Sequence, residues 1–222
     1  MIAAKKVYRP TSDQVATLSF YKNNIVHLFI LYSLICESLK FIKKASKEEI
    51  IKLIEMIYPI FAKDFHLKNE IIDKGSISNA IKVLQSKEIL VEDKAGNIMP
   101  PAENSLFFHN YIALSNLCEP SLKRFYIVMS TIWKSESILK DDLNIKCKKL
   151  AEDLEKIEGW PYPEFSDKAK FDNFVYMMKQ TKFFREDSEG KLSASKITKK
   201  AKNLYERFFD KDFLELIERQ SN

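Results

Sequence analysis

The chain has 222 residues, of which 45% are hydrophobic and 30% charged, and its formal net charge is +5. This balance is typical of a globular protein long enough for one large domain or two small ones, and the high aromatic content argues against disorder. The 4 glycines are too few and too scattered for a glycine-rich phosphate loop. Most basic residues are lysine, whereas bidentate phosphate binding usually uses arginine, so the mild basicity is weak support for nucleic-acid binding.

The 3 cysteines form no Cys-x-x-Cys pair and are odd in number. We expect reduced thiols in a cytosolic chain, with no disulfide framework and no zinc site. The N-terminal segment Met1–Pro10 lacks an apolar core, so it does not read as a secretory signal.

A long helix is predicted at the start of the chain. Thr11 and Gln14 fit a capping box. Apolar residues then recur at spacings of three and four, which places them on one helical face. These residues are Leu18, Tyr21, Ile25, Leu28, Tyr32, Ile35, Leu39 and Ile42. The apolar run from Ile25 to Cys36 is about a dozen residues, too short for the about 20 that a membrane span requires.

Further helices follow along the chain. Ser46 and Glu49 form a second capping box, and Pro59 is expected to kink or shorten the helix that they open. Its inward residues are predicted to be Ile50, Leu53, Ile54, Ile57 and Phe61. Other helical stretches are predicted at 103–133 with an interruption at Pro120, at 139–157 with a stop at Gly159, and at 195–218. The predicted fold class is mainly α.

An internal repeat has an offset of 94 residues. Ile77–Ile98 aligns with Phe171–Leu192, and the identical pairs are Asn79 with Asn173, Glu92 with Glu186, Asp93 with Asp187 and Gly96 with Gly190. Each copy reads as a helix followed by a β-hairpin that turns at the glycine. We therefore expect one domain over 1–222 that contains two winged-helix-like units, at about 47–101 and 138–193.

A tandem winged helix raises the alternative of a nucleic-acid-binding protein. That function needs basic side chains on the groove-entering helix and a basic wing. The first repeat helix offers mainly Lys82 and Lys87, and both hairpins carry Glu-Asp. We expect nucleic acid to be an unlikely partner and favour a structural or interdomain role.

The sequence holds no recognisable catalytic or metal-binding motif. None of the histidines, His27, His66 and His109, is paired with another His or a Cys at metal-ligand spacing, and a Gly-x-Ser-x-Gly segment is missing. His27 is interpreted as a core or interface histidine. The cluster Lys196–Lys202 opens an amphipathic helix compatible with an anionic lipid surface. We predict no catalytic residue, no metal and no cofactor.

Four segments, in order, resemble a known family. Leu18-Ser-Phe-Tyr-Lys-Asn-Asn-x-x-His27 is similar to the Leu-Ser-Tyr-Tyr-Arg-Asn-Asn-x-x-His stretch of bacterial membrane-bound glycerol-3-phosphate 1-O-acyltransferases. Three further segments of this chain resemble stretches of the same family: Ile57–Phe65, Arg124–Met129 and Pro163–Phe171. Lys22 in place of Arg and Ser166 in place of Phe depart from the family pattern. The resemblance covers about residues 18–184.

In that family these segments lie C-terminal to the acyltransferase domain. The resemblance implies acyl transfer from acyl-CoA or acyl carrier protein to glycerol 3-phosphate in phospholipid biosynthesis, with a His-x-x-x-x-Asp motif in which the histidine is the general base. Five residues after the three histidines stand Tyr32, Ile71 and Leu114, so that motif is missing here. No catalytic residue is carried over, and whether this chain alone is an enzyme stays open.

The resemblance therefore implies a scaffolding or regulatory C-terminal part of the enzyme. Its expected partner is an acyltransferase catalytic domain or chain, with the membrane surface and acyl carrier protein as further candidates. The expected location is the cytoplasm or, peripherally, the cytoplasmic face of the inner membrane, without a transmembrane helix. The residues expected to face the catalytic domain are Tyr21, Lys22, Asn23, Asn24 and His27. A free-standing interaction module is a further alternative.

Overall fold

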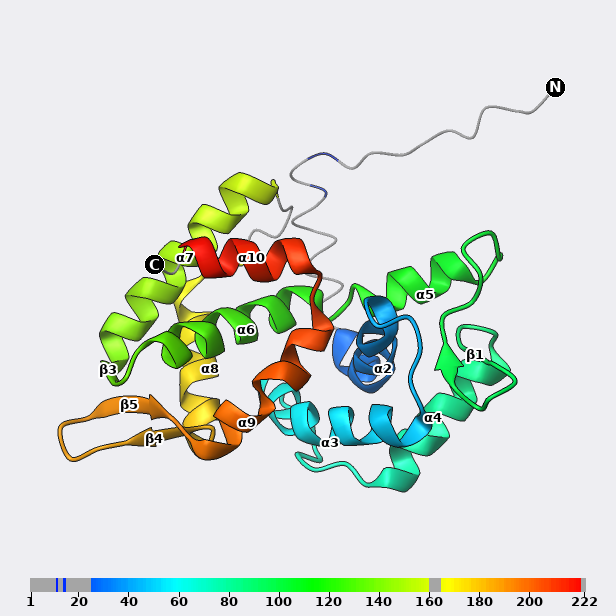
Figure 1. Ribbon diagram of the computed structural model, residues 1–222, viewed down its shortest axis with the longest axis horizontal. Coiled ribbons are helices and arrows are strands. Elements are labelled where there is room, and N and C mark those ends of the chain that lie inside the picture. The colour runs from blue at the N-terminus through cyan, green and yellow to red at the C-terminus, as the bar shows by residue number, and fades with distance from the viewer. Residues whose placement is uncertain (1–10, 12–13, 15–24, 160–164, 221–222) are drawn as a thin grey trace.

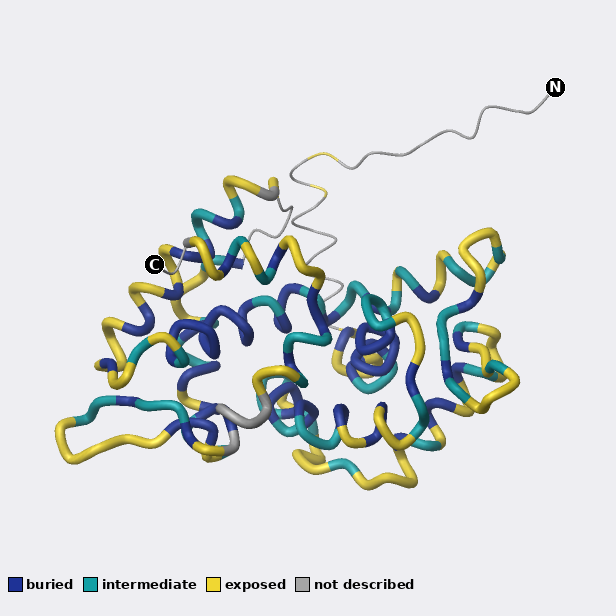
Figure 2. Tube along the Cα trace, viewed as in Figure 1, coloured by how far each residue is buried: buried dark blue, intermediate teal, exposed yellow. Residues whose placement is uncertain are grey.

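The computed structural model describes residues 11, 14, 25–159 and 165–220. Within this part the protein is mainly helical, with one two-stranded and one three-stranded antiparallel sheet, which confirms the predicted fold class (Figure 1). The two sheets lie towards opposite ends of the molecule, and helices fill the space between them. Figure 2 shows that the buried residues concentrate in these central helices.

The N-terminal half comprises a short 3₁₀ turn, three helices and a hairpin. In chain order they are η1 (Val26–Leu28), α2 (Ile30–Lys40), α3 (Lys47–Asp64), α4 (Lys74–Ser86), β1 (Val91–Glu92) and β2 (Ile98–Met99). Ser46 caps α3 through the predicted capping box with Glu49, and Asp73 caps α4 by accepting a hydrogen bond from the Ser76 amide.

The C-terminal half begins with two helices and a short strand and ends with a helical tail. Its elements are α5 (Phe108–Ser115), α6 (Glu119–Lys134), β3 (Ile138–Leu139), α7 (Lys140–Glu158), α8 (Lys168–Gln180), β4 (Phe184–Glu186), β5 (Lys191–Ala194), α9 (Lys196–Tyr205), η2 (Glu206–Phe208) and α10 (Lys211–Gln220). Pro120 lies in the first turn of α6, where its missing N–H costs nothing. Gly159 ends α7 with a φ of 62°, as the sequence predicted.

The element order repeats along the chain. The first repeat consists of α2, α3, α4, β1 and β2, and the second consists of α6, β3, α7, α8, β4 and β5. In the second repeat the strand order is β3-β5-β4. In the first repeat an isolated bridge from Ala45 to Ile98 takes the place of the β3–β5 pair, so the spatial order is the same. Each repeat is therefore a winged-helix-like unit of three helices and a sheet.

The two repeats also share their backbone details at the offset of 94. Glu88 and Lys182, the second residues after the ends of α4 and α8, both lie in the left-handed region, with φ values of 55° and 61°. In each case the next residue donates a hydrogen bond five residues back, from Ile89 to Leu84 and from Phe183 to Met178. This is the Schellman pattern, which turns the chain sharply from the helix into the hairpin.

The prediction of one continuous N-terminal helix is wrong, because the helix is interrupted before Ile30. Thr11 and Gln14 do make the capping-box hydrogen bonds, but residues 12–13 and 15–24 lie outside the described part. Where description resumes, a 3₁₀ turn precedes α2, which starts only at Ile30. The predicted inward residues Ile25 and Leu28 are 54% and 63% exposed, because this break takes them off the helical face that carries Ile35 and Leu39 into the core.

Two other helices differ from their predictions. α3 runs through Pro59 to Asp64, so the proline does not shorten it, and all five predicted inward residues are buried. The predicted C-terminal helix is two helices, because the chain becomes extended at Phe209 between η2 and α10. Phe208 and Phe213 flank this break and are both buried.

An aromatic cluster joins the two repeats. Phe61 of α3 lies 6.4 Å, ring centroid to ring centroid, from both Phe125 of α6 and Phe174 of α8. Phe125 also contacts Phe183 and Tyr205, at 6.3 Å and 5.2 Å. Because each ring is buried and edge-to-face contacts add to the area term, this cluster is a main source of cohesion between the repeats.

Candidate docking groove

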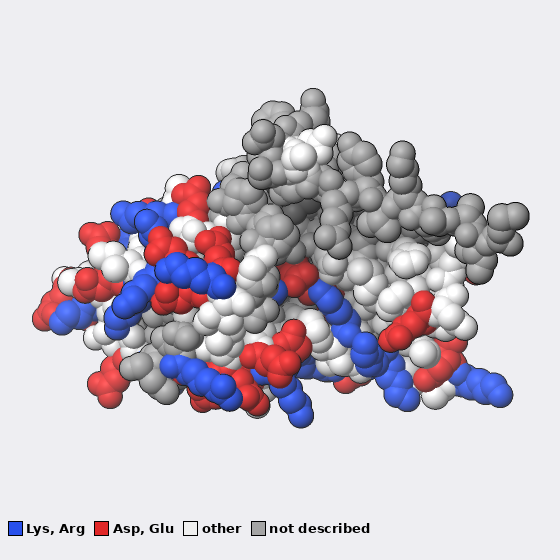
Figure 3. All heavy atoms as spheres, turned by 90° about the horizontal axis from the view of Figure 1, so that it is seen from above, with Lys and Arg blue, Asp and Glu red and all other residues white. Residues whose placement is uncertain are grey.

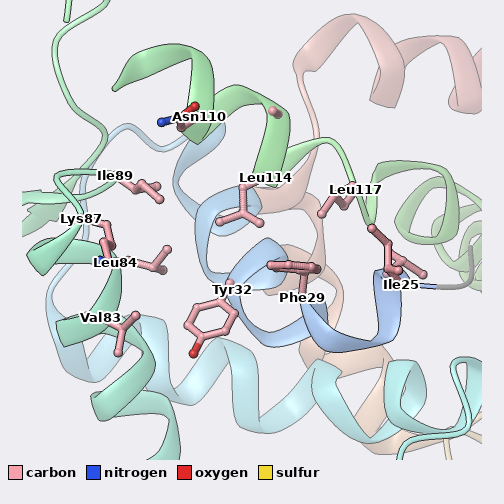
Figure 4. A pocket seen from close by; sticks show the side chains of 12 residues that line it. Ile25, Phe29, Tyr32, Val83, Leu84, Lys87, Ile89, Asn110, Leu114 and Leu117 are labelled. Carbon is pink, nitrogen blue, oxygen red and sulfur yellow. The ribbon is translucent and has the colours of Figure 1, made fainter. Parts of the chain in front are cut away.

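An open apolar groove lies on the first repeat, beside the residues that precede and begin α2. Its volume is about 520 Å³. Figure 4 shows side chains from three elements converging on it. They come from the region of η1 and α2, from the C-terminal end of α4 and from α5, and are Ile25, Val26, Phe29, Tyr32, Val83, Leu84, Lys87, Ile89, Asn110, Ala113, Leu114 and Leu117.

The local geometry explains why these side chains are exposed. The 3₁₀ turn breaks the helical register before α2, so Phe29 stays partly exposed while Val26 and Ile30 enter the core. On the opposite wall, the Schellman turn after α4 brings Ile89 back beside Leu84. The result is a concave apolar surface, and surfaces of this kind usually mark binding sites.

The groove itself offers little chemistry. Its polar side chains are Tyr32, Lys87 and Asn110, and no nucleophile with a neighbouring base is found among its lining residues. Across the described part of the chain, no group of His, Cys, Asp and Glu side chains is arranged to hold a metal ion. The arrangement suits apolar contact, with a basic group at the rim.

The predicted interdomain residues are neighbours in the sequence of Ile25 and Val26, which line the groove. Tyr21, Lys22, Asn23 and Asn24 fall outside the described residues. His27 is exposed in η1, so it is not a core histidine, and the other half of the interpretation, an interface histidine, stays a prediction. His66 and His109 are exposed as well, in other elements.

Sequence reasoning missed the groove itself. The apolar period places Ile25 in the core, and no sequence pattern singles out Val83. The features that shape the groove are visible only in the structure: the positive-φ turn at Glu88 after Val83 and Leu84, and the helix break beside Phe29. Only the tertiary placement of α5 shows that these segments face one another.

A cluster of buried and partly buried charges lies where the C-terminal end of α2 meets the start of α6. Lys40 Nζ is 3.6 Å from Glu37 Oε1 and 3.1 Å from Glu119 Oε2, and Lys123 Nζ is 2.8 Å from Glu119 Oε1. Burial raises the pKa of Glu37 to about 8, although the Lys40 ammonium opposes the shift. Burial also acts to raise the pKa of Glu119, but Lys123 and Lys40 outweigh it and hold that pKa below its ordinary value.

Three of the family-like segments meet at the junction of the repeats. Asp64 accepts a hydrogen bond from Asn173 Nδ2 at 3.3 Å, and the Arg124 guanidinium lies 6.0 Å from the centre of the Phe165 ring. Burial raises the pKa of Asp64, and the positive charges of Arg124 and Lys170 oppose the shift. The described residues of these segments therefore help to hold the two repeats together.

The surface argues against a nucleic-acid interface. α8, the second repeat's counterpart of a recognition helix, packs against α3 and is not free to enter a groove. In the hairpins, the Asp93 and Asp187 carboxylates accept hydrogen bonds from their own turn amides. Figure 3 shows the face seen from above Figure 1, where acidic and basic side chains of the described residues are interspersed and form no single continuous basic surface.

The C-terminal helices bear on the lipid-surface prediction. Phe208 and Phe213, which follow the cluster Lys196–Lys202 in the sequence, are buried, and the Phe213 ring lies 6.0 Å from the Tyr126 ring of α6. That apolar face is therefore occupied by protein. Within the described residues, no helix combines the length and the apolar character needed to cross a bilayer.

The fold and the groove together define a mainly α chain of two winged-helix-like repeats with an open apolar groove. The family model described as "Glycerol-3-phosphate acyltransferase C-terminal region" matches residues 3–187. The chain therefore belongs to this family of C-terminal regions, which confirms the resemblance of the four segments.

Relatives of the chain are much longer proteins. It is 26% identical over 190 residues to the glycerol-3-phosphate acyltransferase of Alteromonas mediterranea, 27% over 199 residues to that of Pseudomonas fluorescens SBW25, and 29% over 200 residues to that of Glaesserella parasuis serovar 5. Each match covers 86% of this chain but only 23% of the relative. No solved structure matches the chain.

Proposed function

We propose that this chain is the non-catalytic C-terminal part of a glycerol-3-phosphate 1-O-acyltransferase and that it acts by packing on the enzyme's catalytic part through the apolar groove. The whole enzyme would transfer an acyl group from acyl-CoA or acyl carrier protein to glycerol 3-phosphate in phospholipid biosynthesis. Contacts with acyl carrier protein, and a location at the cytoplasmic face of the inner membrane, belong to the whole enzyme in this proposal.

The open groove is the observation that carries the proposal. It lies where the family-like segment Leu18–His27 leads into α2, and Ile25 and Phe29 form part of its wall. The matched family is a C-terminal region, and the relatives extend far beyond the match, so most of a relative precedes the point corresponding to this wall.

The non-catalytic role is supported by the histidines. The family's general base needs an aspartate five residues on, whereas His27, His66 and His109 are followed at that distance by Tyr32, Ile71 and Leu114. All three histidines are exposed, and none lines the groove. We therefore expect the purified chain to show no acyl transfer from acyl-CoA.

Co-expression tests the proposal. The part of the Alteromonas mediterranea enzyme that precedes its match is produced with this chain, and with the relative's own C-terminal region as the positive control. We expect this chain to co-purify with that part and to raise its acyl-transfer rate. If the positive control forms a complex and this chain does not, or if the chain alone transfers acyl groups, the proposal is wrong.

A further inference from the structure

The second repeat shows how the outer face of the third helix of a repeat is covered. α8 packs on α6 and α7 of its own repeat and also on α3 of the first repeat. At this contact Asn173 donates a hydrogen bond to Asp64, and Phe174 packs edge-on against Phe61 at 6.4 Å. Thus a helix from the preceding repeat covers the second repeat with an aromatic ring and a carboxylate.

The equivalent face of α4 is open. The offset of 94 makes Asn79 the counterpart of Asn173 and Val83 the counterpart of Met177. Asn79 is exposed, and Val83 is 37% exposed whereas Met177 is 2% exposed. α4 packs mainly on α2 and α3, which are the counterparts of α6 and α7. Among the described residues, no helix covers α4 as α3 covers α8.

Residues spaced by one helical turn make this face continuous with the groove. Asn79, Val83 and Lys87 follow one another at intervals of four, so they lie on one side of α4, and the last two line the groove. α4 contains no acidic residue, and Lys82 is exposed on it. Lys87 is exposed directly after its last residue and is followed by Glu88. The face is therefore apolar at its centre and basic at its margin, which suits an amphipathic helix with acidic side chains.

We propose that this face of α4 binds an amphipathic helix of the catalytic part, which lays apolar side chains on Val83 and in the groove and places a carboxylate on Asn79. The inference rests on the proposed function and specifies its contact. The extra length of the relatives supplies a source, because this chain spans 23% of them and the matched family is their C-terminal region. The α3–α8 contact is the template for the geometry.

Thiol labelling tests this contact directly. Cys36, Cys118 and Cys147 are buried, so in the Val83→Cys variant of the full chain a maleimide reports on position 83. We expect labelling in the free chain and at least tenfold slower labelling in complex with the preceding part of the Alteromonas mediterranea enzyme. In the controls, Tyr176→Cys on exposed α8 surface labels equally in both states, and Met177→Cys labels in neither.

Association measurements give a second test. Val83→Asp is expected to weaken the complex at least tenfold, and Asn79→Ala less, while the circular dichroism of the free chain stays unchanged because both side chains are exposed. Tyr176→Asp serves as the matched exposed control and should not weaken it.

Each other outcome overturns a specific statement. A complex that forms while Val83→Cys still labels at the free rate overturns the α4 contact and leaves the proposed function standing. Absence of a complex, with the relative's own C-terminal region binding, overturns both. Protection of position 83 in the free chain means that another part of this chain or a second copy covers the groove. If anionic phospholipid vesicles alone protect position 83, this face binds lipid. Either of these last two results overturns the proposed contact with an amphipathic helix.

Discussion

The two repeats have the same backbone plan but different side-chain fillings. Where the second repeat places large rings in its interior, the first places smaller aliphatic side chains at the positions 94 residues earlier. The pairs with a ring in the second repeat are Phe125 with Leu31, Phe174 with Ala80 and Phe183 with Ile89. In a fourth pair, the larger aliphatic Met177 corresponds to Val83. The difference in side-chain size matches how far each repeat is covered by other elements. The second repeat is enclosed by α3 and the C-terminal helices, whereas the first is open at α4. Equivalent units therefore need not have equivalent burial.

The largest effect is expected from the centre of the closed repeat. Phe125→Ala removes a fully buried ring that contacts four other rings, and we expect the free energy of unfolding to fall by about 3–5 kcal/mol. Leu31→Ala, at the equivalent position of the open repeat, should cost less because Leu31 is only partly buried. Urea denaturation of both variants checks this, and equal losses would contradict the comparison.

The covered and open helix faces provide the next contrast. Met177→Ala leaves a cavity at a buried site and is expected to cost about 2–5 kcal/mol, whereas Val83→Ala should cost less than about 1 kcal/mol in the isolated chain. Thermal unfolding followed by circular dichroism measures both. A large loss for Val83→Ala would show that the groove is filled within the free chain.

A pH dependence should distinguish the first repeat, because Glu37 is buried in α2 while the equivalent position in α6 is Thr131. The folded-state pKa of Glu37 is raised to about 8 from an ordinary 4.5, so the folded protein holds a proton that the unfolded chain releases. Stability is therefore expected to fall as pH rises from about 4.5 to about 8, by about 2 kcal/mol between pH 5 and 7. In Glu37→Gln this loss should largely disappear from denaturation curves measured across that range.

The smallest effects are expected where the repeats agree. Glu88 and Lys182 both have positive φ values at their helix ends, a conformation that glycine adopts without strain. Glu88→Gly and Lys182→Gly are each expected to stabilise the protein by up to about 1 kcal/mol. Melting temperatures measured side by side should rise similarly, and a loss at either position would show that the side chain makes a compensating contact.

Local signals predicted much of the fold. The capping residues at Ser46 and Glu49, the stop at Gly159 and the paired hairpins depend on chemistry within a few residues, and all were found as predicted. The failures concern continuity. The apolar period does not reveal the break before Ile30, because α2 is buried on nearly all sides and its inward face is not distinguished by hydrophobicity alone. It does not reveal the break at Phe209 either, because Phe208 and Phe213 on its two sides are both apolar and buried.

The candidate site was much less accessible from the sequence. The family-like segment pointed to the correct end of the chain, but its polar residues Tyr21–Asn24 lie outside the described part and their contact with a catalytic domain stays a prediction. The groove depends on α4 and α5 facing the start of α2, which is a long-range arrangement. Asn79 was noticed as an identity between the repeats, but only the Asn173–Asp64 contact gives it a physical meaning.

The packing of α2 against η2 has a consequence for biosynthesis. α2 ends at residue 40 and η2 begins at residue 206, yet the two are in contact and Phe208 is buried. A ribosome delivers the chain from its N-terminus, so the first repeat emerges long before the residues that complete its enclosure. Its central helix therefore remains partly uncovered until residues 206–208 have been made, so we expect this repeat to need shielding by chaperones during synthesis.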